Sequence, residues 1–396
     1  MTLALVVLLA TVPSPARAYS VLAHEASVDA QWDAHIVPLL RARFPHATRA
    51  DLLEARAFAY GGSVIQDIGY YPFGNHFFSN LMHYVRSGDF VERLVADART
   101  VDEYAFALGA LAHYAADNTG HPEAVNRAVA LAYPKLRKKY GDRVTYAQAP
   151  ANHVIVEFSF DVVQAAAGAY LSEAYHGFVG FQVAQDLLER AFRDTYGLDV
   201  KDVLGDEDLA LSTYRYSVSQ LIPEITRTAW ESKKDEIQKL TPSVDENAFV
   251  YRYTKEQYRQ EYGTKYRTPG VFARILAFLY RLLPKIGPLR PLSFKTPEPQ
   301  AEQWFEQSFR DTRARYGNAL VAVGEHRLSL ANTDFDTGRP SHVGEYPLAD
   351  TTYEELVKRL KKKKWAGASA ALRADIDRFY ATSSASPAAT GRRPPE

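Results

Sequence analysis

The stretch GALAHYAADNTGH, residues 109–121, carries the strongest pattern in the sequence. It ends a helical pattern over residues 101–118 and places His113 and Asp117 four residues apart. In an α-helix that spacing puts an imidazole and a carboxylate on one face, roughly 6 Å apart along the axis. His121 follows four residues later, after an Asn-Thr-Gly triplet that we expect to stop the helix.

A second pair, His153 and Glu157 in the segment HVIVE, repeats the same spacing on another expected helix. Both pairs lie in apolar runs, where an unpartnered carboxylate would cost on the order of several kcal/mol. Taken singly, each pair is more typical of a hydrogen bond on a helix surface. Together, on two facing helices, they predict a metal site in the core of a helical bundle.

Further histidine and carboxylate side chains precede these two pairs. Asp67 lies in a segment rich in glycine and aromatic residues, and His76 and His83 follow it. His24 lies near the start of the chain. The other histidines have no partner pattern and are assigned structural or surface roles: His35, His46, His176, His326 and His342.

Helical patterns dominate the whole chain, and almost no segment alternates with period two. The sequence therefore predicts a mainly α fold, a multi-helix bundle followed by a less regular C-terminal region. Loops are expected over residues 61–80 and 138–149, the first because of its glycines and proline. Helices are expected over residues 26–43, 48–60, 89–98, 101–118, 122–137, 151–193 (one or two helices), 207–240, 301–316 and 351–380.

Composition limits the classes of protein and of site. The 396 residues are 46% apolar, and 47 acidic side chains balance 47 basic ones. This length fits one large or two ordinary domains, and the charge balance leads us to expect no stable nucleic-acid partner. Because there is no cysteine, a metal must be held by His, Asp, Glu or backbone groups.

The chain begins with an apolar run that ends in an Ala-Arg-Ala pattern at residues 16–18. We expect residues 1–18 to be a cleaved signal peptide and the protein to be secreted or periplasmic; a retained anchor or a wrongly assigned start are the alternatives. The expected divisions after it are a main domain over residues 19–250, a helical extension over 251–381 and a disordered tail over 382–396.

Two C-terminal segments allow more than one interpretation. Residues 268–293 combine an apolar helix with basic residues, which fits a core helix with basic ends or a helix that lies on a membrane surface. Residues 332–346 are polar and rich in turn formers, which favours a surface loop. The same segment could instead cover the mouth of a site or bind calcium through Asp334 and Asp336.

Taken together, these positions resemble the zinc-dependent phospholipase C family and its relatives, the single-strand-specific zinc nucleases. The family pattern begins with an aromatic residue and a nearby His, continues with an Asp and a His, and ends with two His-x-x-x-carboxylate pairs separated by a His. This chain has matching residues in the same order: Tyr19, His24, Asp67, His83, His113, Asp117, His121, His153 and Glu157. Tyr19 replaces the usual Trp, and His83 fits the spacing better than His76.

The resemblance implies a trinuclear zinc site in the 19–250 domain, which would then be the catalytic domain. One ion would be held by Asp67, His83, His113 and Asp117, and a second by His121, His153 and Glu157. The third would be held by His24, a bridging Asp117, and the amine and carbonyl of Tyr19 once processing exposes them. By the same resemblance, Asp67 would also act as general base.

Such a site suits phosphodiester hydrolysis, because two zinc ions can lower the pKa of a shared water to about 7 and generate a hydroxide. The resemblance implies a secreted phospholipase C-type enzyme whose substrate is phospholipid, met at a membrane surface. Glu157 at the last position and the lack of cysteine favour this branch, whereas the short spacing from Tyr19 to His24 is typical of the nucleases. A nuclease, another phosphoesterase and a non-catalytic member remain the alternatives.

Overall fold

The computed structural model describes residues 21–71, 73–166, 182–216, 234–235, 238 and 295–381. Tyr19, His176 and the 268–293 segment lie outside these residues, as do the expected signal peptide and tail. Within the described parts the chain is helical, and the only β-type pairing is an isolated bridge between Asp334 and Arg339. None of the helices in these parts is both long enough and apolar enough to span a membrane.

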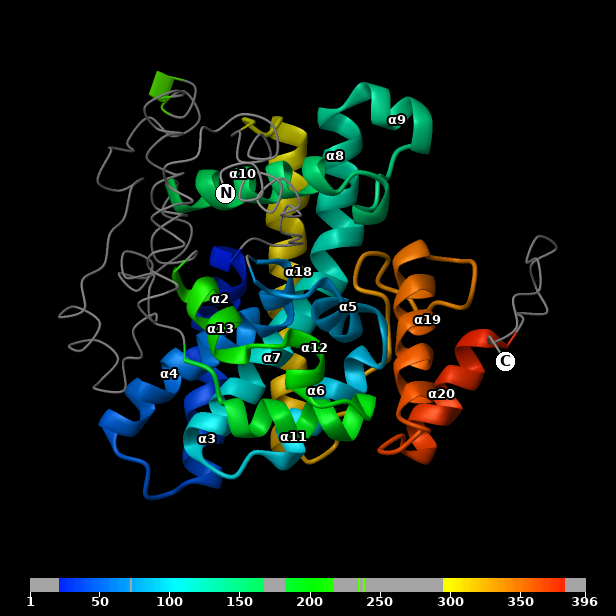
Figure 1. The fold of residues 1–396 in the computed structure, drawn as a ribbon. Helices are drawn as coiled ribbons and strands as arrows, with labels where there is room; N and C mark the ends of the chain where they lie inside the picture. Colours follow the sequence, from blue (N-terminus) through cyan, green and yellow to red (C-terminus); the bar gives the residue numbers. More distant parts are fainter. Residues whose placement is uncertain are drawn as a thin grey trace, which may run out of the picture.

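The helices form one layered bundle around α7, which runs through its middle (Figure 1). The first half consists of α2 (Val21–Gln31), η1 (Trp32–Ile36), α3 (Val37–Arg43), α4 (Arg49–Val64), η2 (Ile65–Tyr70), α5 (His76–Tyr84), α6 (Ser87–Asp97) and α7 (Val101–Gly120). Next come η3 (His121–Val125), α8 (Asn126–Ala132), α9 (Pro134–Tyr140), η4 (Tyr146–Gln148), α10 (Pro150–Ala166), α11 (Gln185–Tyr196), α12 (Val200–Leu204) and α13 (Glu207–Tyr216). The described C-terminal helices are α18 (Pro299–Gly324), α19 (Pro347–Lys362) and α20 (Ala370–Tyr380).

The closest helix crossing joins α4 to α7, and glycine makes it possible. A Cβ atom on Gly62 would lie 1.9 Å from the carbonyl oxygen of Phe106, and one on Gly109 would lie 1.9 Å from that of Ala59. Glycine at both positions therefore allows the two backbones to touch. The contact also brings the carbonyl of Ser63, on α4, next to the side chain of His113, which lies one turn after Gly109 on α7.

We expected the helix to stop after Asn-Thr-Gly, but this prediction is wrong. The chain continues as one helical run through residues 101–132. At His121 the helix widens into the π turn η3. Pro122 has no N–H to donate to the preceding turn, and such a missing bond is a recognised cause of helix distortion. Short π segments are frequent at functional sites, and this one presents His121 to the interior.

The loop expected over residues 61–80 is also mostly helical. Helix α4 extends to Val64, the 3-10 helix η2 continues to Tyr70, and α5 starts at His76. The glycines at 61 and 62 serve close packing instead of a turn. Asn75 caps α5 by accepting a hydrogen bond from the Phe77 N–H at 2.9 Å. The expected loop over 138–149 likewise contains the end of α9 and the short helix η4.

The C-terminal helices are part of the same bundle. Helix α18 runs along α7, where the Tyr316 hydroxyl donates to the Leu108 carbonyl at 2.9 Å, and α19 lies against α5 (Figure 1). Helices α19 and α20 form a pair at one side, joined by the stacked rings of Tyr353 and Phe379. The segment between α18 and α19 is thereby held against the centre of the bundle.

Candidate metal centre

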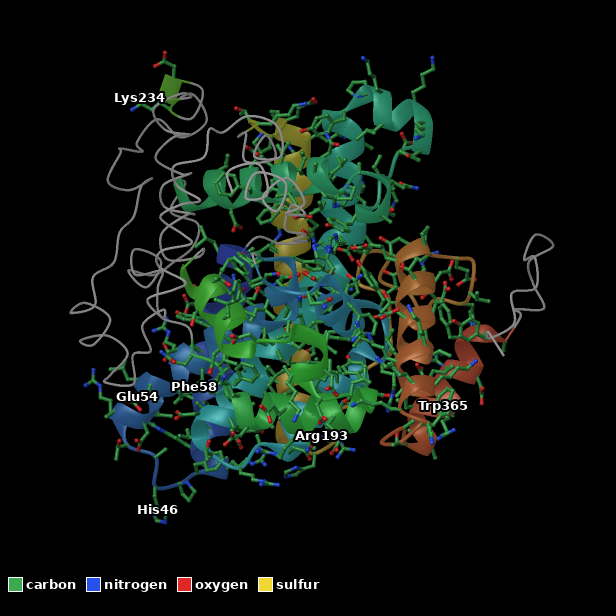
Figure 2. The ribbon with its side chains drawn as sticks, viewed as in Figure 1. His46, Glu54, Phe58, Arg193, Lys234 and Trp365 are labelled. Carbon is green, nitrogen blue, oxygen red and sulfur yellow. The ribbon has the colours of Figure 1, made fainter. Side chains whose placement is uncertain are left out.

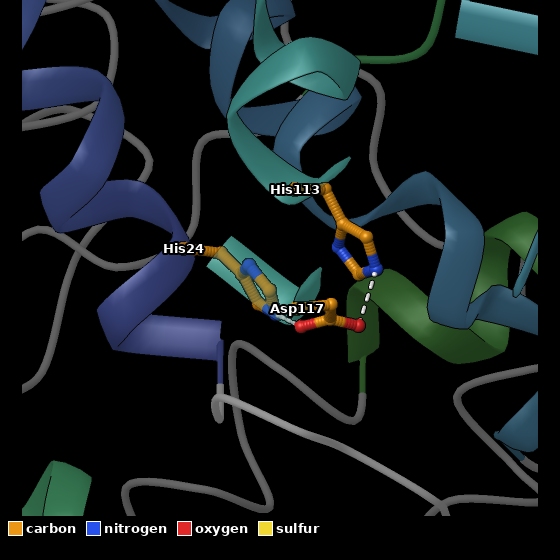
Figure 3. Close-up of side chains that lie close together, drawn as sticks. All are labelled: His24, His113 and Asp117. Atoms are coloured by element: carbon orange, nitrogen blue, oxygen red, sulfur yellow. Dashed lines mark ion pairs between the residues drawn. The ribbon is translucent and has the colours of Figure 1, made fainter. Parts of the chain in front are cut away.

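Asp117 lies at the centre of the first group of polar side chains. It is fully buried on α7, and its two oxygens face three imidazoles. His113 Nε2 is 3.1 Å from Oδ2, His83 Nε2 is 3.4 Å from Oδ2, and His24 Nε2 is 3.5 Å from Oδ1. Figure 3 shows His24 of α2 and His113 of α7 close to this carboxylate. The rings of the two histidines are stacked, with their centroids 4.2 Å apart.

Asp67 adds a second carboxylate to this part of the molecule. It lies on η2, and its Oδ1 is 3.4 Å from the same His83 Nε2 that faces Asp117. Ligand atoms of Asp67, His83 and His113 all lie within 4.8 Å of one another, as do those of His24, His113 and Asp117. The two groups share His113 and therefore form one continuous buried cluster.

Backbone carbonyls fix which nitrogen of each imidazole faces the cluster. His113 Nδ1 is 2.9 Å from the Ser63 carbonyl oxygen, and His83 Nδ1 is 2.8 Å from that of Ser79. A carbonyl oxygen only accepts, so both Nδ1 atoms carry a proton and both Nε2 atoms face the cluster, where each offers a lone pair once it is deprotonated. Metal-binding histidines in proteins are oriented in this way, by a hydrogen bond from their other nitrogen.

A third group lies where η3 meets α10. His121, His153 and Glu157 are buried, and their ligand atoms also lie within 4.8 Å of one another. His153 Nε2 is 2.5 Å from the Val144 carbonyl oxygen, which leaves Nδ1 to face Glu157 Oε1 at 3.3 Å. The i,i+4 spacing on α10 thus directs both side chains at the same point.

The distances within the three groups suit a metal ion better than direct hydrogen bonds. Five imidazole–carboxylate pairs are separated by 3.1–3.5 Å. Charge-assisted hydrogen bonds are usually about 2.7–2.9 Å. Two N or O ligands that each lie about 2.1 Å from a zinc ion, at a tetrahedral angle, are about 3.4 Å apart.

Hydrogen-bond accounting supports the same interpretation. Within the described part of the chain, neither oxygen of Asp67 or Asp117 accepts a hydrogen bond, and His113 Nε2 makes none. Buried polar atoms in proteins almost always have such a partner, so this concentration in one place requires an explanation. Divalent cations bound among these side chains would supply the missing partners. The donor set of imidazoles and carboxylates is the one that zinc takes in the absence of cysteine.

Residues 34–204 match the family model described as zinc dependent phospholipase C. The match spans Asp67, His83, His113 and the other group members up to Glu157, but not His24. Residues 34–204 belong to the zinc-dependent phospholipase C family. Membership of this family implies a phosphoric diester hydrolase. No curated protein and no solved structure matches the chain.

The electrostatics of this phospholipase C domain favour cation binding. Burial lowers the pKa of His24 to about 4, helped by the nearby His113, and burial lowers that of His153 to about 4 as well. Burial also holds the pKa of His121 well below its usual value. These three imidazoles are therefore neutral at pH 7 and have a lone pair to offer.

The two carboxylates act in the opposite direction on His83. Burial alone would lower its pKa, but Asp117 and Asp67 raise it to about 10. Burial would similarly raise the pKa of Asp117, whereas His113, His83 and His24 hold it well below its usual range. The negative potential of Asp67 and Asp117 thus stabilises positive charge beside them, which suits the binding of a metal cation.

The fold brings together every described residue that the sequence analysis selected as a ligand. These are His24, Asp67, His83, His113, Asp117, His121, His153 and Glu157. His76 lies apart from the carboxylates, and its ring contacts the edge of Tyr70 at 5.3 Å. Among the histidines given surface roles, His46 and His326 are exposed, and Figure 2 shows His46 at the periphery of the molecule.

One acidic residue at the centre, Asp336, was considered from the sequence only as a possible calcium ligand and was not selected for the zinc site. Residues 332–346, for which a surface loop was favoured, place Asp334, Phe335 and Asp336 in the interior. Asp336 Oδ1 is 3.3 Å from His121 Nε2, and the ring of Phe335 packs 5.1 Å from that of His83. The alternative in which this segment covers the site agrees with the structure. The close spacing of Asp334 and Asp336 was the feature of the sequence that could have indicated this position near the site.

Proposed function

We propose that the protein is a secreted zinc phosphodiesterase that hydrolyses phospholipids by a phospholipase C-type reaction. The observation that carries the proposal is the convergence of three buried histidine–carboxylate groups, mostly within a zinc-dependent phospholipase C domain. In the reaction, water would add its oxygen to phosphorus, the bond from phosphorus to the glycerol oxygen would break, and a proton would pass to that oxygen.

Three zinc ions are proposed, in the arrangement expected from the family resemblance. His113 belongs to two of the geometric groups, but it presents only one lone pair, so it would bind a single ion. Asp117 has one oxygen toward His24 and the other toward His83 and His113, which suits a carboxylate that bridges two ions. The amino terminus of Tyr19 would complete the ion at His24.

Zinc held there would supply Lewis-acid stabilisation of negative charge and would lower the pKa of water. The chain's own residues would then position the substrate and handle the proton. Asp67 fits the role of general base, because neither of its buried oxygens accepts a hydrogen bond within the described residues. One oxygen can face the cation while the other takes a proton from the attacking water.

Aromatic side chains near the centre support a phospholipid substrate. The ring of Tyr70 lies 5.6 Å from that of His83 and 6.3 Å from that of Tyr146, whose ring is 6.0 Å from that of His153. Aromatic faces bind quaternary ammonium groups such as choline. Phe73, in the turn between η2 and α5, is 45% exposed, which suits contact with a lipid surface.

Hydrolysis of phosphatidylcholine vesicles tests the proposed activity. We expect the purified protein to release phosphocholine, to lose this activity on dialysis against a zinc chelator, and to regain it with Zn²⁺ but not with Mg²⁺, because the site offers imidazoles. Single-stranded DNA is the comparison substrate. Cleavage of DNA without hydrolysis of the lipid would favour the nuclease alternative, and zinc binding without turnover of either would indicate a non-catalytic member.

Secretion is proposed from the first 18 residues and has its own test. Cleavage after the Ala-Arg-Ala pattern would expose Tyr19 as the new amino terminus. We expect mass spectrometry of the protein exported from cells to give a mature chain that begins at Tyr19. A different terminus would remove the proposed backbone ligand of the ion at His24 and leave the ligands of the other two ions intact.

A further inference from the structure

The segment between α18 and α19 enters the metal centre from outside the phospholipase C domain. It is fixed to residues that lie beside the proposed ligands. The Phe335 N–H donates to the His83 carbonyl at 3.2 Å, and the Asn126 side chain donates to the Asp336 carbonyl at 2.7 Å. The Ser87 hydroxyl donates to the Thr333 carbonyl at 2.7 Å. These bonds give the backbone at Asp336 a defined position.

The two oxygens of the Asp336 carboxylate have different surroundings. Oδ2 accepts hydrogen bonds from the hydroxyls of Tyr84, at 3.1 Å, and Tyr346. Oδ1 faces His121 Nε2 at 3.3 Å. A ligating carboxylate commonly has this arrangement, with one oxygen toward the metal and the other fixed by donors from the protein.

The separation of Asp336 from His121 distinguishes two possible roles. A carboxylate that orients a histidine through a direct charge-assisted hydrogen bond would lie at about 2.7–2.9 Å from the nitrogen. Two ligands of one tetrahedral ion would lie about 3.4 Å apart. The observed 3.3 Å equals the distance from His153 to Glu157 in the same region and agrees with the second role.

Charge balance supports this role as well. Histidine binds a metal ion as a neutral imidazole, so His121 and His153 would contribute no charge. With Glu157 alone, a divalent cation in this buried region would keep one uncompensated positive charge. A second carboxylate makes the group neutral, which reduces the free-energy cost of burying the ion.

We infer that Asp336 is an additional ligand of the zinc ion held by His121, His153 and Glu157. The inference rests on the proposed zinc centre and extends it beyond residues 34–204. An ion bound by His121, His153, Glu157 and Asp336 would have four protein ligands, and zinc can expand to five ligands in a transition state. It would join the C-terminal half of the chain to the phospholipase C domain.

Zinc retention by the full-length Asp336→Asn variant tests the inference. We expect this variant to bind one of its zinc ions more than about 100-fold more weakly than the wild type, a larger loss than the roughly 10–100-fold typical of a residue that only orients a ligand. Metal content after dialysis against chelators of graded strength measures the affinity. With Co²⁺ in place of zinc, the visible absorption should change, because water would replace a carboxylate ligand. Asp377→Asn, on the exposed face of α20, is the matched control and should change neither readout.

Thermal unfolding separates a ligand from a residue that only stabilises the segment. If Asp336 binds zinc, the substitution reduces the increase in Tm on adding Zn²⁺ and has little effect on the metal-free protein. An equal loss of Tm with and without Zn²⁺, together with unchanged zinc affinity, would overturn the inference. Failure of the wild type to bind zinc would instead overturn the proposed function.

A milder variant covers the case in which Asp336→Asn does not fold. Tyr84→Phe keeps the carboxylate but removes one of the two hydroxyls that fix Oδ2. We expect a smaller loss of affinity, again confined to one ion and visible in the Co²⁺ spectrum. If Tyr84→Phe has wild-type zinc affinity and an unchanged Co²⁺ spectrum, Asp336 is not held as a ligand.

Discussion

Asp117→Asn is expected to lower kcat/KM on phosphatidylcholine by at least about 10³-fold, because bound metal supplies several kcal/mol of charge stabilisation and each 1.36 kcal/mol is a factor of ten. The two oxygens of Asp117 face three imidazoles in a fully buried position. The amide is uncharged and can present only one oxygen, so it cannot bridge two cations. The variant should therefore lose two zinc ions per chain, measured by metal analysis after gel filtration.

A control on the same helix separates the loss of a ligand from damage to α7. Asp102→Asn makes the same chemical change in the first turn of α7, roughly 22 Å from Asp117 at 1.5 Å per residue. It removes a favourable charge at the helix N-terminus, worth about 0.3–1 kcal/mol, and should leave zinc content unchanged. Full zinc content and activity in Asp117→Asn would contradict the assignment of Asp117 as a bridging ligand.

The two His-x-x-x-carboxylate pairs could be found from sequence because the constraint that joins each pair is local. Helix geometry alone directs His113 toward Asp117 and His153 toward Glu157, and the structure shows both pairs in contact. His83 could be preferred over His76 only through spacing and family resemblance. The structure places His83 between Asp67 and Asp117 because α5 starts at His76 and carries His83 two turns further into the bundle.

The predictions of secondary structure were wrong where a residue type that often ends a helix instead lies within one. The glycines at 61 and 62 were interpreted as turn formers, whereas Gly62 permits the close crossing of α4 and α7 and Gly61 permits the close approach of the Gln182 backbone. The Asn-Thr-Gly triplet before His121 was interpreted as a helix stop, but the helix continues where α18 packs against α7 and η3, and Pro122 only widens one turn. Both outcomes depend on neighbouring segments, which a local pattern does not contain.

Asp336 illustrates a further limit of prediction from local sequence patterns. It is 210 residues from Asn126, which holds its backbone, and no periodicity relates the two positions. Its segment contains turn-forming residues because the chain must bend sharply, and Gly338 adopts a φ of +69° beside the Asn118 carbonyl. A turn composition is typical of surface loops, and only tertiary contacts reveal that this turn points inward.

Glu157→Gln is expected to remove one zinc ion, in contrast to the two lost from Asp117→Asn. His121, His153 and Glu157 share no member with the groups around Asp117, and their side chains come from η3 and α10 instead of α2, η2, α5 and α7. The neutral amide is a far weaker ligand than the carboxylate and leaves the ion with one less negative charge. Metal analysis should give one zinc ion fewer per chain than in the wild type.

The same variant should lower kcat/KM on phosphatidylcholine by about 10²–10³-fold, since the lost ion contributes several kcal/mol of charge stabilisation at about 1.36 kcal/mol per factor of ten. Glu123→Gln is the matched control, because Glu123 lies on the same π turn as His121 but pairs with Arg315 at the surface. Loss of all zinc from Glu157→Gln would mean that the three groups load as one cooperative cluster. Retention of all zinc would remove Glu157 from the ligand set. The loss of a single ion is the expected result, because His121, His153 and Glu157 share no member with the groups around Asp117.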